Sequence, residues 1–153
     1  MEAWIGGSRM SMVSYDDGPL SLDEADRRLS VARQLLQEAC RLKRQVDTLC
    51  VLVDFDLAQN TPEKEKIKKL VSTLTVIMDE LEMIGAYVKD LDVGIIDFLG
   101  KFQGQEIFYC FHLGDKKIIA WHDIHEACSR RNDIIEIQES EKSEGRRNAY
   151  SGP

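Results

Sequence analysis

The chain has 153 residues, a length typical of a single domain that buries a core without needing disulfide bonds or a structural metal. Its composition, 43% hydrophobic and 31% charged, excludes a wholly disordered chain, and its formal charge of −7 disfavours nucleic acid as a partner because phosphate is repelled. Uncharged stretches fall well short of the roughly 20 apolar residues that a membrane-spanning helix needs, so we expect no membrane segment.

Residues 1–19 lack the basic start, apolar centre and small-residue cleavage site of a secretion signal. We therefore expect a flexible leader at 1–19 and a cytoplasmic protein. The cysteines have no close-paired spacing, which predicts that all four are reduced thiols: Cys40, Cys50, Cys110 and Cys128.

A first helix is predicted from residue 22 over about 35 residues. Ser21, with Glu24 three residues later, has the form of a capping box, in which each side chain accepts a free backbone N–H at a helix start. Apolar residues then recur every three or four positions: Leu22, Ala25, Leu29, Ala32, Leu36, Ala39, Leu42, Val46, Leu49 and Val53.

A second helix is predicted to begin at Pro62, whose fixed backbone angle and missing N–H suit the first helical position. Gly85 follows its last apolar residue, as a left-handed cap does. The short connection predicts an antiparallel helical hairpin over 22–84. The apolar set of this second helix is Ile67, Leu70, Leu74, Ile77, Leu81 and Ile84.

The first helix is expected to be about 50 Å long and the second nearer 35 Å, at roughly 1.5 Å per residue. The second therefore leaves part of the first uncovered. Two covers are compatible with this length: the chain's own β-sheet, or a helix of a second copy or another protein. In the latter case the candidate interface residues are Leu29, Leu36, Leu42 and Val46.

Short β-rich segments follow at 86–89, 94–98, 106–113 and 118–122, which predicts an antiparallel β-meander over 86–122. Gln103–Gly104 and Gly114–Asp115 supply turns between the later segments. Helical turns are expected at 125–131 and a short edge strand around Ile134, Ile135 and Ile137. The fold class is thus α+β, a single domain at 20–137, with a disordered tail at 138–153.

The runs GAYVKDLDVGIIDF and GQEIFYCFHLGDKKIIAWHDI, with LSLDEADRRL opening the first helix, resemble a prokaryotic family known only as domain of unknown function 2203. The resemblance covers roughly residues 20–131. It departs after Asp123, where family members commonly carry a glycine-rich turn and this chain has the residues 126–131. The family has no established activity, so the resemblance implies an architecture and brings no catalytic residues or cofactor.

Sulfur, nitrogen and oxygen donors gather near the predicted last strand. They have the chemistry of a zinc or iron site, although their spacing is not that of compact zinc motifs. Strand register decides whether His112 and His122 share a face: a two- or four-residue loop separates them, whereas a three-residue or bulged turn brings them together. The candidate metal ligands are Cys110, His112, His122 and His125.

A candidate small-molecule pocket lies on the same strands, with Trp121 as an apolar wall. Asp90, Asp92 and Asp97 surround the bend before the second strand, where aspartates commonly make turns; Asp97 lies inside the strand. The candidate pocket residues are Asp97, His112, Trp121, His122 and Asp123.

Two functions remain open from the sequence. The first is a non-enzymatic module that pairs its helical hairpin, as a coiled coil, with a second copy or with another protein's helix. The alternative is a small-molecule- or metal-binding protein, or an enzyme, with its site on the sheet. No glycine-rich phosphate loop, nucleophile elbow or HExxH helix occurs in the chain, so no organic cofactor is predicted.

Overall fold

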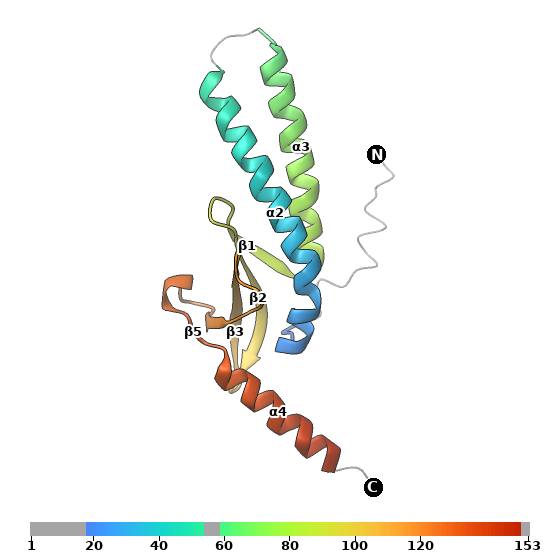
Figure 1. Ribbon diagram of the computed structural model, residues 1–153, viewed down its shortest axis with the longest axis vertical. Helices are drawn as coiled ribbons and strands as arrows, with labels where there is room; N and C mark the ends of the chain where they lie inside the picture. The colour runs from blue at the N-terminus through green and yellow to red at the C-terminus, as the bar shows by residue number, and fades with distance from the viewer. Residues whose placement is uncertain (1–17, 54–58, 151–153) are drawn as a thin grey trace.

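The computed structural model describes residues 18–53 and 59–150, which form an α+β arrangement (Figure 1). Of the leader expected at 1–19, residues 1–17 lie outside the described part. Within the described segments, no helix is long and apolar enough to cross a membrane. The elements are α2 Leu22–Leu52, α3 Pro62–Met83, β1 Ala86–Asp90, β2 Ile95–Phe102, β3 Gln105–His112, β4 Ala120–Asp123, η1 Cys128–Arg130, β5 Asn132–Asp133 and α4 Ile135–Tyr150.

Both long helices begin where the sequence predicts. The Ser21 hydroxyl accepts the Glu24 N–H at 3.0 Å, and the Thr61 hydroxyl accepts the Lys64 N–H at 3.2 Å, so each first turn has a side-chain cap. Pro62 is the first helical residue of α3, and Gly85 follows α3 with a φ of 83°, in the left-handed region that glycine tolerates.

Helices α2 and α3 lie side by side, and the sheet stands beside the end of the pair that includes the start of α2 (Figure 1). The buried residues of α2 share one core with Ile96, Phe98 and Tyr109 of the sheet. The chain's own sheet therefore covers the part of α2 that α3 does not reach, as the first of the two expected covers requires. Consequently Leu29, Leu36 and Leu42 are buried in this core, while Val46 is half-buried.

The sheet is an antiparallel meander in the order β1-β2-β3-β4-β5. Gln103 and Gly104 form the predicted two-residue turn between β2 and β3, with φ values of 52° and 78°. Positive φ at both positions is the conformation whose twist matches that of the flanking strands. The predicted strand at 118–122 begins later, at Ala120, and Ile118, two residues before it, is buried in the core.

Strand pairing divides the sheet residues between two faces. The core face carries Ile96, Phe98, Tyr109 and Phe111, which pack against the helices. Alternate positions point the other way. This outer face, directed away from α2 and α3, carries Asp97, Cys110, His112 and His122 on β2, β3 and β4.

The C-terminal part differs from the expectation. The helical turns expected at 125–131 are the 3-10 segment η1, and the edge strand is β5 rather than the isoleucines after it. The disorder expected from residue 138 is wrong for 138–150, which continue α4. Ile134 and Ile137 anchor this helix in the core. At its start, the Asp133 carboxylate accepts the Ile135 N–H at 2.9 Å. Further along, the Glu141 carboxylate accepts the N–H of Leu22 at the start of α2. Residues 151–153 lie outside the described part.

Candidate metal centre

Four potential metal ligands converge on the outer face of the sheet. Asp97 on β2 pairs directly with Cys110 on β3, and His122 on β4 pairs with Phe108, the next outer-face position along β3. The segment η1 then carries Cys128 over these strands. The ligand atoms of Asp97, Cys110, His122 and Cys128 all lie within 4.8 Å of one another.

The individual distances define a compact cluster. The two sulfur atoms of Cys110 and Cys128 are 3.1 Å apart, and the Cys128 sulfur is 3.6 Å from Nε2 of His122. Oδ2 of Asp97 is 3.1 Å from the same Nε2, and Oδ1 is 3.9 Å from the Cys128 sulfur. Asp97 is 0% exposed and His122 2% exposed, so water does not solvate these polar groups.

The tautomer of His122 is set by its backbone neighbour. Nδ1 lies 2.9 Å from the carbonyl oxygen of Asp123, which can only accept a hydrogen bond, so Nδ1 carries the proton. In the neutral ring, Nε2 then presents a lone pair toward the Asp97 carboxylate and the Cys128 sulfur. Backbone carbonyls orient many metal-binding histidines in this way.

Burial makes negative charge costly at this centre. It raises the pKa of the Asp97 carboxyl, an effect partly offset by His122. It also raises the pKa of the thiols of Cys110 and Cys128, each of which further feels the charge of Asp97. A divalent cation held among these groups reverses the preference, because it supplies the missing positive charge and a coordinated thiol loses its proton.

The cluster has the dimensions of a tetrahedral zinc site. Bonds of about 2.3 Å to sulfur and about 2.0–2.1 Å to nitrogen and oxygen place two sulfurs about 3.8 Å apart, sulfur and nitrogen about 3.6 Å, and nitrogen and oxygen about 3.3 Å. The observed sulfur–nitrogen separation of 3.6 Å matches, the nitrogen–oxygen separation of 3.1 Å is about 0.2 Å short, and the two sulfurs, at 3.1 Å, are about 0.7 Å too close. Small side-chain movements therefore suffice to surround an ion.

A nucleophilic triad is a poorer description of the same residues. A Cys–His–Asp triad needs one ring nitrogen facing the sulfur and the other facing the carboxylate. Here Asp97 and Cys128 both approach Nε2 of His122, and Nδ1 is occupied by the backbone of Asp123. The geometry is that of ligands around a common centre.

The structure brings together only some of the predicted site residues. Cys110 and His122 share the centre, and Asp97 joins them. His112 lies on the same face, and its Nε2 is buried with no hydrogen-bond partner among the described residues, but it is outside the cluster. His125 is exposed, and Trp121 lies on the core face, edge-on to Phe102.

Two further aspartates serve the backbone. The Asp123 side chain accepts the His125 N–H at 2.9 Å, while its carbonyl holds His122. Asp90 accepts the N–H groups of Asp92 and Val93 at 2.8 and 2.9 Å, which confirms the turn-forming role expected for it.

Cys128 is the ligand that the sequence analysis does not identify. It lies in the segment in which the chain departs from the family pattern, six residues after His122 and 18 after Cys110. No compact spacing signals it. The signal that the sequence offers is chemical: a second cysteine that follows the strand of Cys110 and lies six residues after His122.

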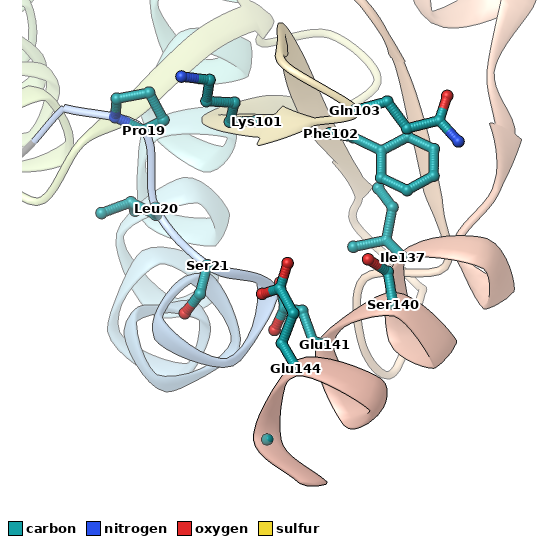
Figure 2. A pocket seen from close by; sticks show the side chains of 11 residues that line it. Pro19, Leu20, Ser21, Lys101, Phe102, Gln103, Ile137, Ser140, Glu141 and Glu144 are labelled. Atoms are coloured by element: carbon teal, nitrogen blue, oxygen red, sulfur yellow. The ribbon is translucent and has the colours of Figure 1, made fainter. Parts of the chain in front are cut away.

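A separate hollow of about 450 Å³ lies between the start of α2, the β2–β3 turn and α4 (Figure 2). Figure 2 shows Glu141 and Glu144 beside Ser21, with Lys101 across the opening. Oε2 of Glu141 accepts the Leu22 N–H at 2.8 Å, so this carboxylate satisfies the first turn of α2. One of the two glutamates lining the hollow therefore acts as a helix cap.

Comparison with known proteins gives a single assignment. The family described as "Uncharacterized conserved protein (DUF2203)" matches residues 20–134, most of the described chain. Searches of curated proteins and of solved structures return no match. The matched region includes all five strands of the described sheet and all four residues of the candidate metal centre. The chain therefore belongs to the uncharacterized conserved family DUF2203.

Proposed function

We propose that this chain binds one zinc ion through Asp97, Cys110, His122 and Cys128, and that the ion ties the segment around Cys128 to the outer face of the sheet. The observation that carries the proposal is the convergence of four buried or half-buried Lewis bases within 4.8 Å. Without a cation, both thiols stay protonated and the Asp97 carboxyl has only the His122 ring as its charge partner, in a site that burial makes unfavourable for charge.

The donor set favours zinc over the other common metals. Two thiolates and one imidazole suit a borderline-soft ion, and a single carboxylate is too few oxygen ligands for calcium or magnesium. Zinc also accepts the tetrahedral arrangement that four such ligands make.

A structural role follows from the number of ligands. Catalytic zinc sites keep three protein ligands and leave a position for water or substrate, whereas structural sites are closed by four. Here four side chains from β2, β3, β4 and η1 fill the coordination sphere. The proposed ion thus joins three strands to a segment that otherwise has few buried side chains.

The test is the metal content of the untagged protein, measured by mass spectrometry of the elements after dialysis against zinc. We expect one zinc per chain. Replacing the zinc by cobalt should give the intense visible absorption of a tetrahedral site and a sulfur-to-cobalt charge-transfer band.

The matched variants are His122→Asn and His125→Asn. The first removes a proposed ligand and should abolish stoichiometric zinc; the second removes an exposed histidine three residues away and should retain it. Equal zinc content in the two variants would contradict the proposal. So would a parent protein that binds no zinc.

We infer a second, independent role for helices α2 and α3, as an antiparallel hairpin that pairs with a second copy of the chain. The supporting observation is the exposure of apolar side chains at the end of the pair remote from the sheet: Val51 is 84% and Leu52 73% exposed. The leucines predicted for this interface, Leu29, Leu36 and Leu42, are buried in the core. Val51 and Leu52 replace them as interface candidates.

The variant Val51→Glu/Leu52→Glu tests this role. We expect it to convert a dimer into a monomer in sedimentation experiments. The control is Val93→Glu, which charges a similarly exposed valine in the turn after β1 and should leave the mass unchanged. A monomeric parent protein at high concentration would exclude the pairing.

A further inference from the structure

The two sulfurs of the metal centre are placed for direct bond formation. They are 3.1 Å apart, and a disulfide bond of about 2.05 Å needs them to approach by only about 1 Å. The other two cysteines, Cys40 and Cys50, are free and lie ten residues apart on α2, about 15 Å along its axis, so they cannot bond to each other.

We propose that a hydroperoxide oxidises Cys110 and Cys128 to a reversible disulfide, and that this bond expels the zinc ion. The inference rests on the proposed zinc site and adds its regulation. It makes the centre a modification site at which oxidation changes how the Cys128 segment is held.

Exposure determines the order of attack. Cys128 is half-buried in the short segment η1, whereas Cys110 is fully buried in the central strand β3. A hydroperoxide therefore reaches Cys128 first. Cys110, 3.1 Å behind it, is the resolving cysteine.

The chemistry is a two-electron oxidation. The Cys128 thiolate attacks one peroxide oxygen, the O–O bond breaks, and the departing oxygen takes up a proton and leaves as water from hydrogen peroxide. The Cys110 thiolate then attacks the sulfur of the Cys128 sulfenic acid, the S–O bond breaks, and the hydroxide leaves as water after taking up a second proton. Two thiolates, one hydrogen peroxide and two protons thus give one disulfide and two waters.

Loss of the metal follows from the ligand count. A disulfide sulfur is a poor ligand compared with a thiolate, so the bond removes two of four ligands at once. Asp97 and His122 remain, and two ligands of this kind hold zinc weakly. A reductant that restores the thiols should restore the site.

The experiment uses the untagged full chain loaded with zinc. Its zinc content is measured first, which tests the proposed function before any oxidant is present. Hydrogen peroxide is then added, released zinc is followed with a colorimetric chelator, and peptides are mapped by mass spectrometry. We expect one zinc released per Cys110–Cys128 disulfide, and recovery of binding after dithiothreitol and fresh zinc.

Two variants isolate the pair. Cys50→Ser removes a half-buried cysteine on α2, away from the site. Under peroxide this variant should release zinc as the parent does. Cys110→Ala removes the resolving cysteine, so the oxidation of Cys128 should stop at a sulfenic acid that dimedone traps. This second readout needs no bound metal.

The outcomes separate the two proposals. A chain that binds zinc but retains it under peroxide, or loses it without the Cys110–Cys128 bond, overturns this inference and leaves the zinc site standing. A chain that never binds zinc overturns the proposed function and the release step with it, whether or not the disulfide forms.

Discussion

The two faces of the sheet are held by different forces. On the core face, Phe98, Tyr109 and Phe111 are fully buried, and they belong to the apolar core shared with α2 and α3. On the outer face, the most buried groups are Asp97, Cys110 and His122, which gain little from leaving water. Burial by itself explains the stability of the first face. The second face places its buried carboxyl beside the ring of His122 at 3.1 Å, and it is there that we propose a bound cation.

The largest expected effect is on the core face. Phe98→Ala should lower the free energy of unfolding by about 3–5 kcal/mol, because it removes a buried ring and leaves a cavity. Tyr87→Ala on the outer face, where the ring is 48% exposed, should cost less than about 1 kcal/mol. Urea denaturation of both variants measures the difference. Equal losses of unfolding free energy would contradict a greater contribution of the core face to stability.

Zinc removal should act on the outer face alone. At free zinc of 100 to 1,000 times the dissociation constant, the bound ion stabilises the fold by about 2.7–4.1 kcal/mol. Chelation should therefore lower the unfolding free energy by a similar amount and raise amide exchange most at residues 124–131. Exchange that rises equally along α2 and the core-face strands would contradict a local role for the ion.

A smaller effect is expected where the core face is most tightly packed. An added Cβ at Gly100 would lie 2.4 Å from the Tyr109 ring, so Gly100→Ala should destabilise the fold by about 1–3 kcal/mol. Gly145→Ala, in α4 with no neighbour within 4 Å, should instead stabilise it by up to about 1 kcal/mol. Thermal unfolding should show a lower Tm for Gly100→Ala and a higher Tm for Gly145→Ala.

The smallest effect concerns one hydroxyl at the edge of the core face. Tyr109 donates a buried hydrogen bond of 2.8 Å to the carbonyl oxygen of Leu20. Tyr109→Phe keeps the ring and removes the bond, so we expect a loss of about 1 kcal/mol. Its zinc content should equal that of the parent; a variant with lower zinc content would show that the two faces are coupled.

The sequence predicts the helices and the first sheet turns because their signals are local. The cap at Ser21, the proline at 62 and the Gln103–Gly104 turn each act over a few residues. The register of β4 is a different matter. Seven residues separate β3 from β4, and Cys110 pairs with Ala120, so even-numbered positions of both strands share a face. No tight turn specifies that choice.

Only half of the proposed metal centre is predictable from the sequence, for the same reason. The sequence analysis predicts Cys110 and His122 as metal ligands from their chemistry, whereas only the tertiary structure adds the candidate ligands Asp97 and Cys128. The sequence does not predict α4 because this segment is mostly polar or charged, and only Ile134 and Ile137 join it to the apolar core. Two buried side chains are too weak a pattern to distinguish an anchored helix from a disordered tail.

The hydrogen bond between Leu22 and Glu141 has a consequence for folding during synthesis on the ribosome. The two residues are 119 positions apart. At about 5–20 residues per second, a ribosome needs roughly 6–24 seconds between them. Throughout that interval the opening turn of α2 lacks its acidic partner, and Leu20 lacks the Tyr109 hydroxyl for most of it. The segment made first is thus among the last to reach its final contacts, so a nascent chain should expose this end to chaperones longest.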